Sequence, residues 1–217
     1  MDLTQLLERS LLGVGVVLPL PVRADLLRLQ EELLRWTARV NLTAITDPEE
    51  ALEKHLVDSL TILGDIDQTG RLLDLGSGGG FPGLPLRLAA PGLRVLSVDA
   101  VLKKITFQRH LVRQLGLDGF VAWHGRAEEV PQRSDLGAGF DRVVSRAFTS
   151  LEQFVRLALP CLARDGRIIA MKGAEGEGEL RQAEPVLAEL GLVPIECRML
   201  TLPVSGARRT VIVLGRF

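Results

Sequence analysis

The stretch Leu72-Leu73-Asp74-Leu75-Gly76-Ser77-Gly78-Gly79-Gly80-Phe81-Pro82-Gly83 decides the fold of this 217-residue chain. An apolar run ends at Leu75, glycines follow, and a helical pattern begins at Pro82. Glycines at such a turn let the backbone approach a ligand closely and offer its N–H groups. In an open α/β sheet, ligands bind where a strand ends and its helix begins. The stretch therefore predicts a ligand site at the carboxyl end of a strand.

Two residues of this glycine loop narrow the class of ligand. Dinucleotide-binding loops follow the pattern G-x-G-x-x-G, whereas Phe81 stands here in place of the third glycine. Asp74 lies two residues before Gly76, where a carboxylate would repel a pyrophosphate. It suits a ligand with a positive charge, such as a sulfonium or an ammonium; the alternative is that Asp74 only caps the loop. A nicotinamide-dependent oxidoreductase is therefore disfavoured.

Asp99 ends the next apolar run along the chain. In doubly wound folds an acidic residue at this place binds ribose hydroxyls, and a carboxylate accepts from two neighbouring hydroxyls. The alternative is that Asp99 caps the helix that starts near Val101. The loop and Asp99 together describe a site for an adenosine-type ligand with a cationic tail and no phosphate. S-adenosylmethionine fits that description, and a non-catalytic adenosine-sensing module remains an alternative.

The alternation of short apolar runs with helical patterns continues on both sides of the loop. It predicts a doubly wound, seven-stranded, mostly parallel α/β sheet with helices on both faces. The last two strands are close in sequence and are expected to form an antiparallel hairpin at one edge. The predicted strands are residues 71–75, 94–99, 120–124, 140–145, 167–172, 193–200 and 210–215, and the helices between them are 82–90, 101–115, 151–162 and 177–190.

Helical patterns fill the chain before the loop. Apolar residues at helical spacing predict a helix over 23–40, and Asp47 is expected to cap a second helix that runs to about residue 63. We therefore expect an N-terminal helical extension, residues 1–65, that caps a Rossmann-like domain of residues 66–217 in one compact unit.

Composition excludes several classes of protein. Hydrophobic residues make up 47% of the chain and charged residues 24%, which is typical of a globular protein. Two cysteines and three histidines at no ligand spacing predict that no metal is bound. The longest apolar stretch, residues 11–22, is broken by prolines and is shorter than the ~20 residues of a membrane-spanning helix. With no basic leader, the chain is expected to be cytoplasmic and not bound to a membrane.

Charge is unevenly distributed along the chain. Residues 1–70 hold six basic and twelve acidic residues, whereas residues 71–217 hold twenty and fifteen, giving charges of −6 and +5. The second part could meet an anionic partner, or its charge could be an ordinary balance for its length.

Several motifs together resemble those of a known enzyme family. The pattern Asp74-x-Gly-x-Gly-x-x-Phe81-Pro82-Gly83 resembles the first motif of class I methyltransferases, and the variant with Pro-Gly is similar to the RsmG (glucose-inhibited division protein B) family of bacterial 16S ribosomal RNA methyltransferases. The likeness covers almost the whole chain. Its further motifs are Trp36 with Asn41-Leu42-Thr43, His55-Leu56-Val57-Asp58-Ser59, Asp99 with Lys103-Lys104, Arg126-Ala127-Glu128-Glu129, Ser145-Arg146-Ala147-Phe148, Met171-Lys172-Gly173 and Arg208-Arg209.

The resemblance implies a class I, Rossmann-like fold and an S-adenosylmethionine-dependent 16S rRNA (guanine-N7)-methyltransferase, with S-adenosyl-L-homocysteine as the product. Another RNA or a protein is the alternative substrate. N7 of guanine has a lone pair and no proton, so we expect no general base. Arg146 would act by positioning: it could pair with a phosphate, donate to guanine O6, or hold Glu128 or Asp99. The expected cofactor-binding residues are Asp74, Gly76, Gly78, Phe81, Asp99, Ala127, Glu128 and Arg146.

The expected substrate is 16S rRNA or a 30S ribosomal precursor, bound by a monomer. Phe148 could stack on the base or belong to the core, and His55 and Asp58 could face the cleft or form a structural pair. Arg208 and Arg209 are placed in a turn over residues 203–209, where they contact RNA phosphate or pair with Glu196 or Asp165. The predicted RNA-binding residues, each of which could also be a solvated surface cation, are Lys103, Lys104, Arg126, Lys172, Arg208 and Arg209.

Overall fold

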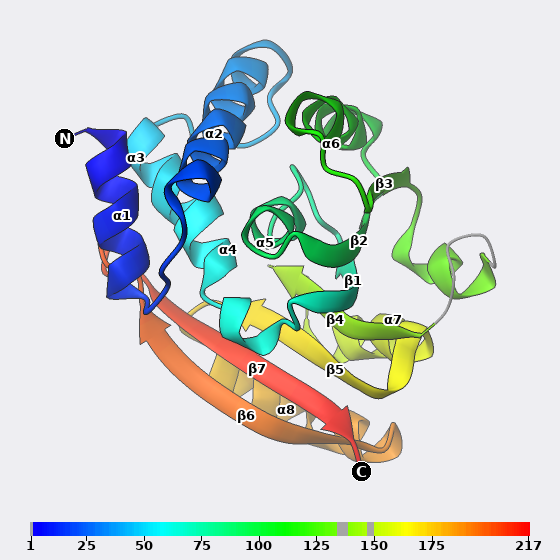
Figure 1. Cartoon of the computed structure of the whole chain (residues 1–217). Coiled ribbons are helices and arrows are strands. Elements are labelled where there is room, and N and C mark those ends of the chain that lie inside the picture. Colours follow the sequence, from blue (N-terminus) through cyan, green and yellow to red (C-terminus); the bar gives the residue numbers. More distant parts are fainter. Residues whose placement is uncertain (1, 134–138, 147–149) are drawn as a thin grey trace.

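A computed structural model describes residues 2–133, 139–146 and 150–217, and the described residues form one seven-stranded sheet (Figure 1). The strand order is β3-β2-β1-β4-β5-β7-β6, and the first five of these strands run parallel. The strands are β1 Thr69–Leu75, β2 Gly92–Asp99, β3 Phe120–His124, β4 Phe140–Arg146, β5 Leu162–Lys172, β6 Leu192–Thr201 and β7 Arg208–Arg216.

The predicted edge hairpin is confirmed. β7 pairs antiparallel with β5 on one side and with β6 on the other, so β6 is the outermost strand. Figure 1 shows this hairpin as two long arrows below the parallel strands. The doubly wound α/β fold that the sequence predicts is therefore present, and each predicted strand lies within an observed one.

Helices cover both faces of the sheet, because successive side chains of a strand point to opposite faces. Leu72, Val95 and Val144 pack in one hydrophobic cluster with α5 and α6. Leu73 and Val143 pack on the other face with α7 and α8. The bounds are α5 Gly83–Ala89, α6 Leu102–Leu115, α7 Leu151–Ala158 and α8 Gly176–Glu189.

The N-terminal helices lie on the α5–α6 side and share its hydrophobic cluster (Figure 1). They are α1 Leu3–Gly13, α2 Leu20–Val40, α3 Pro48–Ala51 and α4 Asp58–Leu60, with a π-helical turn at Leu52–Val57 between α3 and α4. Asp47 caps α3, as predicted, by accepting from the Glu50 amide at 2.8 Å. The predicted regular helix to residue 63 is wrong in detail, since the π turn interrupts it. Such turns are frequent at functional sites.

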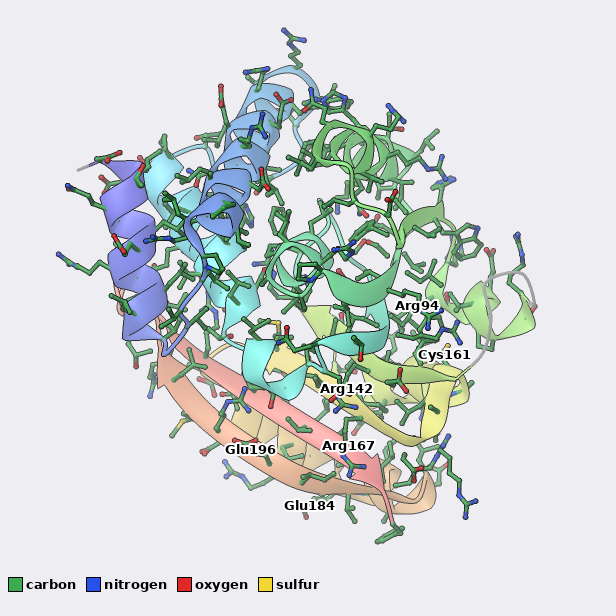
Figure 2. All side chains as sticks on the ribbon, viewed as in Figure 1. Arg94, Arg142, Cys161, Arg167, Glu184 and Glu196 are labelled. Atoms are coloured by element: carbon green, nitrogen blue, oxygen red, sulfur yellow. The ribbon has the colours of Figure 1, made fainter. Side chains whose placement is uncertain are left out.

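The connection near residue 65 is tied to the sheet by arginines. Arg142 of β4, labelled in Figure 2, donates from Nε to the Asp65 carbonyl at 2.8 Å and pairs with Asp67 at 3.0 Å. Arg198 of β6 pairs with the Asp65 carboxylate. A domain boundary at residue 65 stays a prediction. Within the described residues, no helix has the length and apolar character that crossing a membrane requires.

Candidate cofactor and substrate site

The glycine loop lies at the carboxyl end of β1 with a backbone that side chains rarely adopt. Gly76, Gly78 and Gly80 have φ values of 69°, 59° and 94°. Only glycine populates this region without steric cost. The amides of Gly76 and Ser77 donate to the Val98 carbonyl at 2.9 and 3.0 Å, which fixes the loop to β2.

Gln108 of α6 holds the glycine loop in place through side-chain hydrogen bonds, a role that the sequence analysis missed. Its Nε2 donates to Ser77 Oγ at 2.9 Å and to the Gly78 carbonyl at 2.8 Å, while its Oε1 accepts from Ser97 Oγ at 2.7 Å. Gln108 is fully buried. A polar residue on the buried side of a predicted helix was the available signal.

Asp74 is fully buried under the loop. Its Oδ2 accepts from the Gly83 amide at 2.9 Å, so the capping role is present. Its Oδ1 has no hydrogen-bond partner among the described residues. Burial raises the Asp74 pKa to about 7, because a low-dielectric site disfavours the charged form. The free oxygen leaves room for a second role toward a cation.

Asp99 joins the glycine loop to α6. Its Oδ2 accepts from the Gly78 amide and its Oδ1 from the Val101 amide, both at 2.8 Å. Asp99 therefore accepts from the backbone at the start of α6, as the capping alternative predicted. Each carboxylate oxygen has two lone pairs, so these bonds leave acceptor capacity for ribose hydroxyls. Lys104 Nζ lies 3.9 Å from Oδ2, which places Lys104 at the loop.

The loop borders a cavity of about 190 Å³, called here the cofactor-side cavity. Its floor is backbone of the glycine loop, which suits a ligand that needs close approach to N–H groups. Together with the free oxygen of Asp74 and the left-handed glycines, it fits an adenosine-type cofactor with a cationic tail. Its lining residues are Leu33, Leu42, Thr43, His55, Gly76, Ser77, Gly78, Gly79, Phe81, Lys104 and Arg146.

Arg146 ends β4 and closes the far wall of this cavity. Its Nη1 donates to the Lys54 carbonyl, and its Nη2 lies 3.2 Å from His55 Nδ1. Its guanidinium carbon lies 5.5 Å from the centre of the Phe81 ring. Burial lowers the pKa of Arg146, and the Asp58 and Asp74 carboxylates oppose that shift. Arg146 therefore borders the cavity at the glycine loop. It makes no hydrogen bond to Glu128 or Asp99 within the described chain.

His55 contacts both Arg146 and Phe81, and its imidazole is neutral. Burial, followed by the charges of Arg146 and Lys54, lowers its pKa to about 3. Arginine has only donors, so Nδ1 accepts and Nε2 carries the proton toward Thr43 Oγ1, 3.2 Å away. Its ring stacks on Phe81 at 4.8 Å. His55 and Asp58 do not pair with each other; each contacts an arginine.

A second cavity of about 400 Å³, which shares Arg146 and His55 with the first in its lining, is called here the substrate-side cavity. Asp58 Oδ2 accepts from Arg209 Nε at 3.0 Å, and Lys172 Nζ pairs with Glu179 at 2.7 Å. The lining is rich in charge and comes from distant parts of the chain. It consists of Ile45, Lys54, His55, Asp58, Arg146, Met171, Lys172, Gly173, Glu179 and Arg209.

The remaining predicted site residues surround these two cavities. Ala127 and Glu128 open the short helix Ala127–Gln132 directly after β3, where Ala127 is half-buried and Glu128 is exposed. Lys103 donates to the carbonyls of Val40 and Asn41 at 2.8 and 2.9 Å, so it caps the end of α2. Arg126 is exposed.

The predicted turn over residues 203–209 is wrong at its end. Arg208 and Arg209 are the first two residues of β7, because they pair with Thr201 and Leu200 of β6. Arg208 is exposed, whereas Arg209 points to the substrate-side cavity. Arg209 pairs with Asp58 rather than with Glu196 or Asp165. Phe148 and its predicted stacking lie outside the described residues.

Glu53 is a further residue that the sequence analysis missed. It is 1% exposed, and its carboxylate accepts from the amides of Val204 and Ser205, at 2.5 Å and 3.0 Å. The π turn therefore anchors the β6–β7 turn through Glu53. It also holds the Arg146 side chain, through the Lys54 carbonyl and His55. A buried acid in a predicted helix was a signal for such an anchor.

Among the residues that the structure describes, no cluster of three or more His, Cys, Asp or Glu side chains could hold a metal ion. Cys161 is buried and Cys197 is exposed, and both are free thiols.

Comparison with protein families and sequences gives consistent matches. Residues 23–204 match the family described as rRNA small subunit methyltransferase G. The chain is similar to "Ribosomal RNA small subunit methyltransferase G" of Geobacter sp. strain M21, at 47% identity over 98% of this chain and 97% of that protein. Proteins of the same name from Myxococcus xanthus and Deinococcus radiodurans are 44% and 41% identical, covering 94% and 98% of this chain and 93% and 84% of theirs.

Solved structures with low sequence identity share the fold. Precorrin-6y C5,15-methyltransferase from Geobacter metallireducens has a TM-score of 0.57 at 14% identity, over 73% of this chain and 87% of that one. TYW2 from M. jannaschii in complex with AdoMet has a TM-score of 0.58 at 12% identity, over 74% and 75%. These likenesses confirm the Rossmann-like architecture of class I methyltransferases.

Proposed function

The chain belongs to the rRNA small subunit methyltransferase G family, and from this premise we propose that it methylates N7 of one guanosine in 16S ribosomal RNA. The family and the fold make the chain an S-adenosylmethionine-dependent rRNA methyltransferase. The observation that supports the proposal best is the pair of cavities that meet at Arg146 and His55. We assign the first cavity to the nucleoside cofactor and the second, whose lining holds four cationic side chains and two carboxylates, to the RNA.

On the cofactor side, Gly76, Gly78 and Phe81 form the cradle, and Asp99 accepts from the ribose hydroxyls. S-adenosylmethionine, when bound, supplies a methyl group activated by a sulfonium. The unpaired Oδ1 of Asp74 is a buried carboxylate oxygen, the kind of group that stabilises a positive charge away from water. Ala127 and Glu128, at the end of β3, flank the adenine.

The reaction needs alignment rather than proton transfer. Guanine N7 carries a lone pair and no proton, so no side chain has to act as a base. His55 fits this requirement, because its pKa of about 3 keeps it neutral and both its ring nitrogens are engaged. Arg146 holds the target base against the cofactor-side cavity. Such positioning contributes ~7–11 kcal/mol to rate acceleration in favourable cases.

RNA approaches along the positively charged rim of the substrate-side cavity. Lys172 and Arg209 line the cavity itself, and both are held by carboxylates until a phosphate or base competes for them. The other proposed phosphate contacts are Arg126 and Arg208, which are exposed, Lys103, which also caps α2, and Lys104, which lies at the glycine loop. The partner is 16S rRNA or a 30S precursor in the cytoplasm, and the enzyme acts as a monomer.

Labelled-methyl transfer tests this function. Small-subunit RNA is isolated from cells that lack the gene, incubated with the protein and labelled S-adenosylmethionine, and cleaved chemically at 7-methylguanosine. We expect one labelled guanosine and one cleavage position. Label in an exocyclic amine, in a ribose hydroxyl, or only in protein would contradict the proposal.

A further inference from the structure

Asp58 lines the substrate-side cavity, and one of its carboxylate oxygens is buried without a hydrogen-bond partner among the described residues. Its side chain is 5% exposed, and Oδ2 is occupied by Arg209 Nε at 3.0 Å. Oδ1 has no hydrogen-bond partner among the described residues. Nearly all buried polar side-chain atoms in folded proteins are paired, because an unpaired one is costly. Such an oxygen beside a cavity of about 400 Å³ indicates an acceptor whose donor arrives with a ligand.

Arg146 stands next to this acceptor and supplies donors. Its Nη1 lies 3.8 Å from Asp58 Oδ2, and Arg146 borders both cavities while Asp58 borders only the substrate side. From the glycine loop outward, a ligand therefore meets first a donor and then an acceptor. The order of polar groups along a bound base must match this order.

Guanine has the matching order of groups on one edge. N7 and O6 are acceptors side by side. N1–H, the next group along the ring, is a donor. If N7 faces the cofactor-side cavity, O6 meets Arg146 and N1–H meets Asp58. Adenine presents an amino donor at C6 and an acceptor at N1, so it would set donor against donor and acceptor against acceptor.

We propose that Asp58 is the residue that selects guanine, by accepting a hydrogen bond from N1–H while Arg146 donates to O6. This inference rests on the proposed function, since it assumes that N7 of a guanine is the methyl acceptor. The terminal torsion of an aspartate is broad, so a modest rotation turns its carboxylate toward the cavity. Glu179, the other carboxylate of the lining, accepts from Lys172 and from the Leu151 amide through Oε2.

Base analogues in the target position test the selection without changing the protein. An RNA fragment is made with guanosine, inosine or 2-aminopurine at that position, and kcat/KM for methyl transfer is compared. Inosine keeps O6 and N1–H and should react within about tenfold of guanosine. The 2-aminopurine RNA lacks both and should lose about 1,000-fold or more, because buried polar groups are then left unpaired. Equal loss with inosine and 2-aminopurine would overturn the proposal.

The Asp58→Asn variant provides the complementary test. Its amide can donate to the lone pair at N1 of 2-aminopurine, so the preference for guanosine over 2-aminopurine should narrow by about 100-fold. A merely structural role would lower both rates equally and leave the ratio unchanged, which would refute the selection role. Cofactor affinity and the melting temperature check the fold, and the analogue series with the wild-type protein decides if the variant does not fold.

The two proposals fail in different ways. If the wild-type protein does not methylate guanosine at N7, the proposed function and this inference both fall. If it does so, but Asp58→Asn leaves the guanosine preference intact, only the inference falls.

Discussion

The two cavities that share Arg146 in their linings differ in whether backbone or charged side chains line them. The cofactor-side cavity has a floor of contiguous backbone at residues 76–79. The substrate-side cavity is lined by charged side chains from the π turn, α4, β4, β5, α8 and β7, between Lys54 and Arg209 in sequence. A site made of backbone is encoded locally by glycines. A site made of side chains exists only after the sheet has brought distant residues together.

Two carboxylates are half-paired: Asp58 lines the substrate-side cavity, and Asp74 lies under the glycine loop, two residues before the loop begins to line the cofactor-side cavity. Asp74 and Asp58 are both buried, and each has one oxygen without a partner among the described residues. Both carboxylates act on the pKa of Arg146, which lies between them. In the proposed function, Arg146 separates the place for the sulfonium cation from the place for a base with an N–H donor.

Substitution of the loop backbone should give the largest effect. Gly76 has φ 69°, which a β-branched side chain tolerates poorly, and a side chain would fill the cofactor approach. We expect Gly76→Val to weaken cofactor binding by about 1,000-fold or more, measured by calorimetry. Gly64→Val is the matched control, because that site has open space and no positive φ. Normal cofactor affinity in a folded Gly76→Val protein would remove the loop from the site.

Arg146→Lys should impair positioning of the target base and so slow methyl transfer. Lysine keeps the charge but loses the planar fork that reaches the Lys54 carbonyl and His55. Single-turnover methyl transfer at saturating cofactor should fall about 100-fold, while cofactor affinity changes less than tenfold. Arg156→Lys, at an exposed pair with Glu189, serves as the control. A rate within twofold of the wild type would show that Arg146 does not position the base.

Asp99→Ala should weaken cofactor binding and leave the substrate-side cavity unchanged. Loss of a charged acceptor for the ribose hydroxyls should weaken cofactor binding by ~1–3 kcal/mol. Loss of the bonds to the Gly78 and Val101 amides should also lower the free energy of unfolding by about 1 kcal/mol. Calorimetry with a thermal melt separates the two. An unstable variant with unchanged affinity would leave Asp99 only a capping role.

The pH dependence of binding should distinguish the sulfonium from the thioether product. Burial raises the Asp74 pKa to about 7, so the carboxyl is largely protonated below that pH. A sulfonium favours the carboxylate, and its binding must release the proton. S-adenosylmethionine affinity should therefore rise up to about tenfold from pH 6 to 8, beyond any rise for S-adenosylhomocysteine. Asp74→Asn should abolish the difference; parallel curves in the wild-type protein would contradict a role toward the cation.

The surface arginine should give the smallest effect. Arg208 is exposed at the start of β7, so Arg208→Ala should lower the slope of log affinity for RNA against log salt by ~0.7, one phosphate contact. Arg209→Ala should in addition lower the melting temperature, because it strips Asp58 of its partner. An unchanged slope for Arg208→Ala would withdraw the RNA contact there.

Local patterns predicted the architecture well. The period of apolar residues located every strand, because a buried parallel sheet needs such runs. The glycine loop was also evident from its sequence. The π turn was not, because Glu53 and His55 make their contacts with distant parts of the chain, the β6–β7 turn and β4. The pairing of Arg209 with Asp58 and of Lys172 with Glu179 likewise needed the fold.

A structure of the protein with S-adenosylhomocysteine and an RNA fragment bearing the target guanosine tests the central claim most directly. We expect the thioether sulfur in the cofactor-side cavity beside the glycine loop and the guanine in the substrate-side cavity. N7 should point toward the sulfur across the boundary formed by Arg146 and His55. A guanine bound elsewhere on the surface, or one that presents its exocyclic amine to the sulfur, would contradict the account.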